Sequence, residues 1–168
     1  MVARYPSAVR LPTLAYRAIG RFSVTRFDQL LHPFLYRLTG GRSVFGRSLG
    51  VATLLLTTVG RVSGESRTVA LYGFPVGPAV GSPAGSWAVI ASRGGSRRIP
   101  AWYQNLVAQP TAMVQVGRHR FATRPRELTG DAYEAVFEQA AAAYAGYRLY
   151  RAEAPHHIPI VVLEPGLG

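Results

Sequence analysis

The stretch VATLLLTTVGRVSGESRTVALYGF, residues 51–74, decides the fold of this chain. Residues 51–58 are an apolar run of the length of a buried strand, and residues 68–74 alternate in character with the period of two that a strand requires. The intervening residues 60–67 contain two glycines, which supply the positive φ angles that tight turns need. The stretch therefore predicts two strands joined by a turn.

Further strands are predicted downstream of this pair. Residues 75–86 are rich in glycine and proline, which predicts a long exposed hairpin loop after the second strand. The remaining strands are predicted at residues 87–92, 112–116, 118–123 and 158–163. Two of them, on either side of Gly117, are close enough in sequence to form a hairpin.

Two helices are predicted among these strands. One covers residues 100–107, with Pro100 near its first turn, where proline fits a helix. The other covers residues 131–144, with Thr129 as its N-cap and Gly146 ending it. Short hairpin connections dominate, and few strand–helix–strand crossovers are available. The predicted fold is therefore mainly β with flanking helices (α+β), an antiparallel β-barrel rather than a doubly wound parallel sheet.

The first 40 residues follow a different pattern. Apolar side chains repeat there at helical spacing, in a segment rich in arginine, and Gly40-Gly41 ends the pattern. We predict two parts: an amphipathic helical segment at residues 1–40 and a barrel domain at residues 41–168. Such a basic amphipathic segment is able to lie on an anionic membrane surface.

The composition limits the chemistry. The chain of 168 residues has no cysteine, which excludes disulfides, thiolate catalysis and cysteine-bound metals. Its formal net charge is +11, and every basic residue is arginine, which grips phosphates and carboxylates with a planar fork. This favours an anionic partner: a phosphorylated cofactor, a nucleic acid or an anionic membrane. The alternative is a solvated basic surface. No nucleic-acid recognition motif accompanies the charge, so no nucleic-acid partner is predicted.

Three motifs have the wrong context for the chemistry that they suggest. GRSLG at residues 46–50 matches a nucleophile elbow, but a strand follows it where a helix is required. GRSVFGRS at residues 41–48 resembles a phosphate-binding loop in the reverse structural order. His156 and His157 are neighbours at a strand start and point to opposite faces, so no metal site is predicted.

Two other segments are suited to binding an anion. The turn at residues 60–67 carries Arg61 and Arg67 beside its glycines. Residues 92–98, SRGGSRR, stand between a strand and a helix start, where free N–H groups and the positive helix end add to the arginine charge. Each segment alone is also compatible with an ordinary polar turn. Finding both in one small domain favours a phosphorylated ligand.

Aromatic side chains accompany these segments. Trp102 and Tyr103 lie on the predicted helix after the second segment, where they serve either as core or as walls for a flat ring. Tyr144, Tyr147 and Tyr150 recur at every third residue, either as an amphipathic lid or as a cover that also offers hydroxyl groups. No triad, carboxylate pair or metal cluster is evident. We therefore expect a cofactor to perform the reaction.

Four ordered motifs resemble the deazaflavin (coenzyme F420)-dependent nitroreductase family. LLLTTVGRVSGESR at residues 54–67 is similar to that family's first signature, and ASRGG at residues 91–95 with PAWYQNL at residues 100–106 is similar to the second. The tyrosine repeat with IPIVVLEP at residues 158–165 matches a third, and LYRLTGG at residues 35–41 matches the usual lead-in. Together these cover most of the chain from about residue 35 onward.

The resemblance implies a split β-barrel like that of FMN-binding proteins, with coenzyme F420 as the cofactor. Its reduced form passes a hydride to a quinone, a nitroaromatic or a similar electron-poor acceptor. By position, the phosphate and acidic tail are assigned to Arg61, Ser63, Gly64, Arg67 and Arg93. The ring is assigned to Ser92, Gly94, Pro100, Ala101, Trp102 and Tyr103. The acceptor side is assigned to Tyr72, Tyr144, Tyr147 and Tyr150. The catalytic candidates are the last three of these tyrosines and Ser92.

Two departures from the family pattern bear on these expectations. Val62 stands where the family commonly has a basic residue, so one phosphate contact is either lost or supplied by Arg97 or Arg98. His156 and His157 stand where many members have arginine. Two other functions remain open: an FMN-dependent barrel enzyme, and a non-catalytic cofactor-binding or membrane-docking protein. A cytoplasmic location is expected, with the inner face of the cell membrane as an option through residues 1–40. The oligomeric state is left open.

Overall fold

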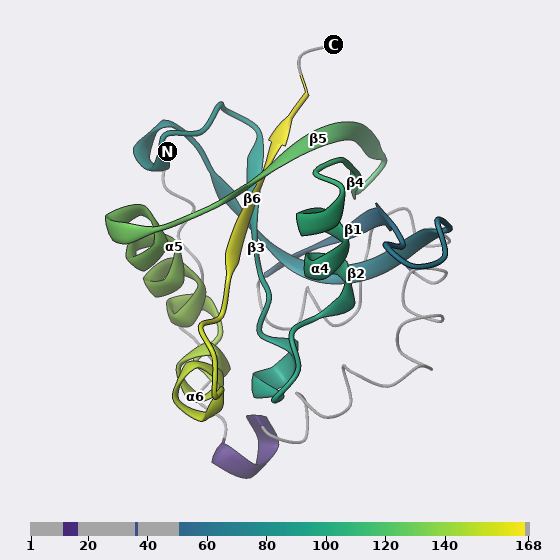
Figure 1. The fold of residues 1–168 in the computed structure, drawn as a ribbon. Coiled ribbons are helices and arrows are strands. Elements are labelled where there is room, and N and C mark those ends of the chain that lie inside the picture. The colour runs from purple at the N-terminus through teal and green to yellow at the C-terminus, as the bar shows by residue number, and fades with distance from the viewer. Residues whose placement is uncertain (1–11, 17–35, 37–50, 167–168) are drawn as a thin grey trace.

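The computed structural model describes residues 12–16, 36 and 51–166, and most of this part forms an antiparallel barrel. Its six strands are β1 (Ala52–Val59), β2 (Ser66–Val76), β3 (Ser86–Ile90), β4 (Ala112–Val116), β5 (His119–Glu127) and β6 (Ile160–Pro165). They close in the order β1-β2-β3-β6-β5-β4, and every neighbouring pair is antiparallel (Figure 1). The predicted antiparallel barrel with flanking helices is confirmed.

The β1–β2 hairpin is the longest pairing of the barrel. Its register runs from Ala52 opposite Gly73 to Val59 opposite Ser66. Leu54 and Leu56 are fully buried, because alternate residues of a strand face the barrel interior. The turn needs glycine at Gly64, whose φ is +69°.

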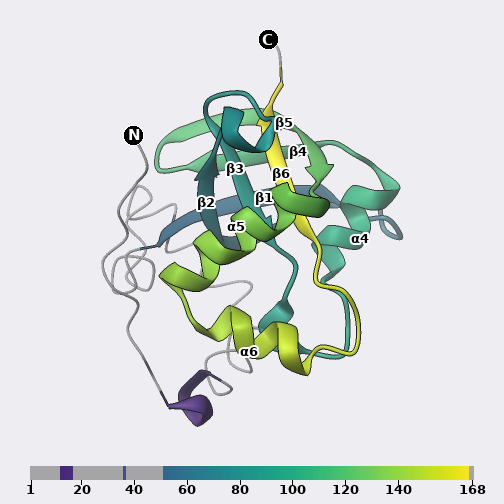
Figure 2. The same ribbon diagram turned by 90° about the vertical axis from the view of Figure 1, so that its left-hand side faces the viewer.

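Among residues 51–166, three α-helices flank the barrel. Helix α4 (Ala101–Ala108) follows β3 after the short 3-10 turn η2 (Arg93–Gly95). Helices α5 (Gly130–Ala143) and α6 (Gly146–Glu153) precede β6 and lie together on one side of the barrel, away from α4 (Figure 2). A second 3-10 turn, η1 (Pro78–Val80), lies in the loop between β2 and β3.

Strand β6 is buried on both faces and separates two apolar clusters. Val161 and Leu163 belong to the cluster inside the barrel, which Trp102 and Leu106 of α4 join. Ile160 and Val162 belong to the cluster beneath α5 and α6. This alternation follows from the period of two along a strand, and it explains why the segment is apolar throughout.

The predicted end of the tyrosine-bearing helix is wrong. Gly146 was expected to stop a helix that reached residue 144, but α5 already ends at Ala143 and Gly146 opens α6. Tyr144 is therefore the C-cap residue of α5, while Tyr147 and Tyr150 belong to the next helix. Thr129 is the N-cap residue of α5 as predicted, although its side chain makes no capping hydrogen bond.

The loop after β2 is more ordered than predicted. Ser82 is 4% exposed and donates a hydrogen bond to Glu164 of β6 over 2.9 Å. Arg126 of β5 forms an ion pair with the same carboxylate and also donates to the Val80 carbonyl. These contacts fix the loop to the end of the barrel. The predicted helical segment at residues 1–40 and the two rejected motifs at residues 41–50 lie almost wholly outside the described residues.

Candidate functional site

The first anion-binding turn is held by hydrogen bonds within its own backbone. The Gly60 N–H donates to the Glu65 carbonyl over 2.8 Å, and the Gly64 N–H donates to the Gly60 carbonyl over 2.7 Å. Ser63 Oγ accepts a hydrogen bond from the Glu65 N–H at 3.3 Å. A Cβ added at Gly60 would lie 2.8 Å from Ser63 Oγ. A side chain at residue 60 would therefore have to displace Ser63 Oγ, whereas the positive φ of Gly64 itself favours glycine.

Asn105 of α4 connects this turn to the rest of the site. Its Oδ1 accepts a hydrogen bond from the Arg61 N–H over 3.1 Å, and its Nδ2 donates to Thr58 Oγ1 over the same distance. Asn105 is 4% exposed and Thr58 is 2% exposed, so both polar groups are paired where water is excluded. The hairpin turn is thus fixed against the middle of α4.

The second turn has an unusual backbone. Ser92 is in the right-handed region at φ −76° and ψ −30°, and Arg93 follows in the left-handed region at φ +44°. Gly94 and Gly95 continue with φ angles of +63° and +74°. A right-handed residue followed by a left-handed one turns successive N–H groups toward a common point, which is a known anion-binding arrangement. Strained backbone at a non-glycine residue is typical of functional sites.

The second turn lies against α6. A Cβ at Gly95 would stand 3.2 Å from both Cα and Cδ1 of Tyr150, so Tyr150 would have to shift, and the φ of +74° at Gly95 also favours glycine. Both views place η2 beside α6 (Figures 1 and 2). The segment predicted to bind an anion and the predicted tyrosine repeat therefore meet in space, although about 55 residues separate them in the sequence.

Most arginines of the two turns are free to bind an anion. Within the described part of the chain, Arg61, Arg93, Arg97 and Arg98 form no ion pair with a carboxylate. Arg67 differs, because its Nη2 lies 2.6 Å from Glu65 Oε2. That pair is exposed, so its net contribution to stability is small and an incoming phosphate is able to compete for the guanidinium.

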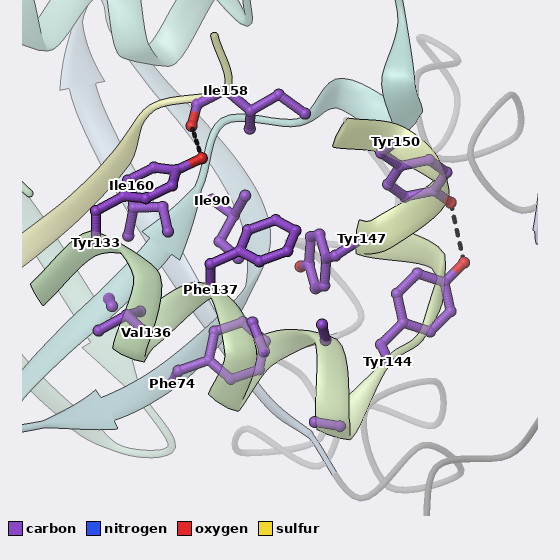
Figure 3. Packing of buried hydrophobic residues seen from close by; sticks show 14 of the residues in the cluster. Phe74, Ile90, Tyr133, Val136, Phe137, Tyr144, Tyr147, Tyr150, Ile158 and Ile160 are labelled. Carbon is purple, nitrogen blue, oxygen red and sulfur yellow. Dashed lines mark hydrogen bonds between the residues drawn. The ribbon is translucent and has the colours of Figure 1, made fainter. Parts of the chain in front are cut away.

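The predicted tyrosines form one buried cluster (Figure 3). The Tyr144 hydroxyl donates a hydrogen bond of 2.9 Å to the Tyr150 hydroxyl, because the Tyr150 proton is donated to the Tyr16 carbonyl. The Tyr147 ring packs edge-on to Tyr144 at 5.5 Å and to Phe74 at 5.9 Å between centroids. The Tyr72 ring, from β2, is 6.4 Å from that of Tyr144. All four predicted acceptor-side tyrosines are thus brought together.

Burial makes these hydroxyls harder to ionise than an exposed tyrosine, which is already protonated at physiological pH. Desolvation is the main cause that raises the pKa of Tyr144 and of Tyr147 far above the ordinary value. It also raises the pKa of Tyr150, to about 12. At physiological pH each group is therefore neutral, and a neutral phenol is able to donate a hydrogen bond to an oxygen of a ligand.

The residues predicted to face a flat ring begin α4. Pro100 is its N-cap residue, and Trp102 is 8% exposed within the barrel cluster. Tyr103 is half-buried, and its ring meets Trp102 edge-on at 6.2 Å between centroids. Its hydroxyl donates to Glu127 Oε2 over 2.7 Å. Ala101 is exposed, and Ser92 is 8% exposed.

Three residues of this region were missed by the sequence reasoning. Asn105 had a usable signal, because it is a polar residue at a helix position three after the buried Trp102, where an unpaired amide would be costly. Glu127 and Tyr16 had none. The Tyr16 carbonyl accepts a hydrogen bond from the Tyr150 hydroxyl over 3.0 Å, and the two residues are 134 positions apart in sequence.

The described part of the chain has neither a cluster of metal-binding side chains nor a helix suited to a membrane. Among residues 12–16, 36 and 51–166, no group of three or more histidine, aspartate or glutamate side chains is placed to hold a metal ion. No helix within those ranges is long and apolar enough to cross a membrane.

Fold and site together define a class: an antiparallel barrel whose two arginine-bearing turns and buried phenols suit a phosphorylated aromatic ligand. Comparison with known proteins gives the family. Residues 31–165 match the family model described as F420H(2)-dependent quinone reductase. The chain belongs to this enzyme family, and the predicted relationship to deazaflavin-dependent reductases is confirmed.

Individual relatives agree with the family assignment. The chain is 32% identical over 139 residues to an F420H(2)-dependent quinone reductase of Mycobacterium tuberculosis. The aligned region covers 79% of this chain and 87% of that protein. Among solved structures, an F420-H2 dependent reductase (FDR-A) is 34% identical and superposes with a TM-score of 0.58, over 67% of this chain and 93% of the other. A further structure, titled as a domain-swapped dimer, is 29% identical with a TM-score of 0.59, over 83% and 100%.

Proposed function

We propose that this protein transfers a hydride from reduced coenzyme F420 to a quinone, and that nitroaromatic compounds are alternative acceptors. The supporting observation is that α4 connects the two arginine-bearing turns: its Asn105 holds the Arg61 N–H, and its start follows the Arg93 turn. The family match and the names of the relatives point to the same cofactor and to a quinone acceptor.

The residues of the two turns fit a ligand with a phosphate and an acidic tail. Arg61, Arg67 and Arg93 would hold these negative groups, helped by the backbone at Ser63 and Gly64. Ser92, Gly94 and the start of α4 from Pro100 to Tyr103 would line the ring. When bound, the reduced deazaflavin supplies the hydride.

The tyrosines would act on the acceptor. The neutral hydroxyls of Tyr144, Tyr147 and Tyr150 would donate to the oxygen of a quinone or nitro group that gains negative charge. For Tyr144 and Tyr150 this donation would replace the hydrogen bonds that they make to Tyr150 and to the Tyr16 carbonyl. The packed rings would exclude water from that oxygen. Ser92, buried beside the second turn, is a further donor to the reacting region.

Replacing Arg61 and Arg67 with alanine tests the cofactor assignment. Each change removes a charged hydrogen-bond donor, and loss of one such contact typically weakens binding by more than about tenfold. We expect the double variant Arg61→Ala/Arg67→Ala to bind F420 at least about a hundredfold more weakly in a fluorescence titration. The matched control is Arg148→Ala, which removes an exposed arginine paired with Glu138 on the α5–α6 side.

Two results would contradict the assignment. Wild-type protein that leaves F420 fluorescence unchanged would exclude the cofactor, and protein that purifies yellow would indicate FMN instead. Oxidation of reduced F420 should be followed against menadione, nitroaromatics and unsaturated cyclic ketones. A rate with menadione that exceeds the others supports the quinone assignment, and a protein inactive with every acceptor contradicts the proposed reaction.

We also propose that the N-terminal segment contacts anionic membrane from the cytoplasmic side. Residues 1–40 carry six arginines and one acidic residue in an apolar background, and quinones are found in membranes. The full-length protein should sediment with vesicles that contain anionic lipid and remain in solution with neutral vesicles. Replacement of Arg17, Arg21 and Arg26 with glutamine should reduce this binding, and equal binding to both vesicle types would contradict it.

A further inference from the structure

Glu127 is the one carboxylate of the barrel strands whose partner in the structure is a tyrosine. Among the described residues, Glu65, Glu134, Glu138 and Glu164 each form an ion pair with an arginine. Glu127 forms no such pair there, and instead accepts the hydroxyl proton of Tyr103 over 2.7 Å. In a protein of net charge +11, a carboxylate that pairs with a tyrosine rather than with an arginine is unexpected.

The position of Glu127 is fixed by the fold. It is the last residue of β5 and pairs with Val161 of β6, and the following Leu128 N–H donates to the Ile160 carbonyl over 2.9 Å. Tyr103 is in the first turn of α4, three residues after Pro100. A short charged hydrogen bond between two fixed elements holds the Tyr103 hydroxyl in one orientation.

This orientation decides what Tyr103 is able to recognise. A phenol whose hydroxyl is unpaired is able either to donate or to accept a hydrogen bond. The Tyr103 hydroxyl already donates its hydrogen bond to the Glu127 carboxylate. Its oxygen keeps its acceptor capacity, and the side chain is only half-buried, so a ligand is able to reach it. The raised pKa of Tyr103, about 12, is caused first by burial and then by the Glu127 hydrogen bond and charge, and it keeps the phenol protonated at physiological pH.

We propose that Glu127 is a positioning residue of the cofactor site: it holds the Tyr103 hydroxyl so that the phenol oxygen accepts a hydrogen bond from a ring N–H of the bound deazaflavin. This inference rests on the proposed function, because it takes the start of α4 as the place of the ring. It goes further by assigning the Tyr103 oxygen as a hydrogen-bond acceptor. Such a contact favours a ring that carries an N–H at its edge.

Binding measurements on wild type and four variants test the inference. The affinity for F420 is measured by fluorescence for wild type, Glu127→Ala, Glu127→Gln and Tyr103→Phe. We expect Glu127→Ala and Tyr103→Phe each to weaken binding by about tenfold, the effect of one lost hydrogen bond with an unpaired partner. Glu127→Gln should keep wild-type affinity, because its amide oxygen also accepts the phenol proton. The fourth variant, Glu127→Ala/Tyr103→Phe, should bind F420 no more weakly than Tyr103→Phe alone.

The sign of the effect separates positioning from simple electrostatics. Removing a carboxylate makes the protein more positive, which by itself favours an anionic cofactor. The control Glu138→Ala makes the same change of charge on α5 and should bind F420 no more weakly than wild type. A deazaflavin with its ring N–H methylated provides the second comparison: wild type and Glu127→Gln should discriminate against it about tenfold more strongly than Glu127→Ala does.

Each outcome has one interpretation. If wild type fails to bind F420, the proposed function itself is wrong. If wild type binds but Glu127→Ala binds equally well, or if all variants discriminate equally against the methylated ring, then Glu127 does not orient Tyr103 and the inference is overturned. Thermal unfolding of each variant checks that it is folded, and an affinity loss that Glu127→Gln shares would also overturn the inference.

Discussion

A single amide determines how the two ends of the proposed cofactor site are connected. The Asn105 side-chain oxygen accepts a hydrogen bond from the Arg61 N–H, and its amide nitrogen donates to the Thr58 hydroxyl. Asn105 itself is nearly fully buried. Neither hydrophobic packing nor charge gives this connection. Because the amide is satisfied on both sides, its loss leaves the buried Thr58 hydroxyl and the part-buried Arg61 N–H without this partner.

Asn105→Ala should therefore affect stability and binding together. We expect the free energy of unfolding to fall by about 1–3 kcal/mol, the usual effect of leaving buried polar groups unpaired. F420 affinity should fall as well, because the turn around Arg61 is no longer fixed. Urea unfolding and fluorescence titration measure the two effects. Val107→Ala, at a position 68% exposed on the same helix, should change neither, and an Asn105→Ala protein with wild-type affinity would contradict the role given to this bridge.

The break between α5 and α6 is the feature that assembles the tyrosines. Tyr144 caps α5, and a new helix begins two residues later, so Tyr147 and Tyr150 are presented from a different axis (Figure 3). Gly146 makes this possible, since a Cβ there would overlap the Tyr144 ring. The requirement is steric and does not depend on a left-handed backbone.

Gly146→Ala should disturb the cluster without removing any functional group. The added methyl group must displace the Tyr144 ring, and overpacking of this kind typically costs about 1–3 kcal/mol. We expect a lower melting temperature and a larger loss in the rate of acceptor reduction than in F420 affinity. Gly77→Ala is the control, because no atom lies within 4 Å of a Cβ at that extended position. Equal behaviour of the two variants would show that the break tolerates a side chain.

At the scale of the whole molecule, the buried phenols make stability depend on alkaline pH. Folding raises the pKa of Tyr144, Tyr147 and Tyr150, chiefly by burial, so the folded state holds these protons more tightly than the unfolded state. The resulting stabilisation is complete below the unfolded pKa of about 10 and is lost as the pH rises toward and through the folded values.

We therefore expect the free energy of unfolding to fall steeply above about pH 10, the unfolded pKa of tyrosine. Denaturant titrations at a series of pH values measure it. Tyr150→Phe should reduce the alkaline slope between about pH 10 and the folded Tyr150 pKa of about 12, because one group no longer contributes. A slope unchanged by this substitution would mean that Tyr150 ionises as easily in the folded protein as in the unfolded chain.

The strands were predictable because their pattern is local. Period-two alternation and glycine turns placed all six, and the lengths of the connections indicated an antiparallel barrel. The strand order β3-β6-β5 could not be predicted from the sequence, because it depends on pairing between strands that are far apart in the chain. The break between α5 and α6 was also missed. Gly146 was expected to end one helix, but in the structure it begins a second helix that packs against the first.

The site was predictable only as a set of chemical groups. Arginines beside glycines indicated two anion-binding turns, and repeated tyrosines indicated an aromatic surface. The contacts that unite them were not: the close approach of Gly95 to Tyr150 and the pairing of Tyr103 with Glu127 join residues remote in sequence. The roles of the individual residues toward F420 stay predictions that the binding experiments above test.

The hydrogen bond from Tyr150 to the Tyr16 carbonyl has a consequence for ligand binding. One helical turn at residues 13–16 lies beside α6, and the Tyr16 ring packs edge-on to Tyr144 at 5.3 Å between centroids. Whatever occupies the space next to these phenols must either accept that turn as a neighbour or break its bond to Tyr150. If a compound changes how tightly this turn docks on α6, then docking of the turn changes the affinity for that compound by the same factor.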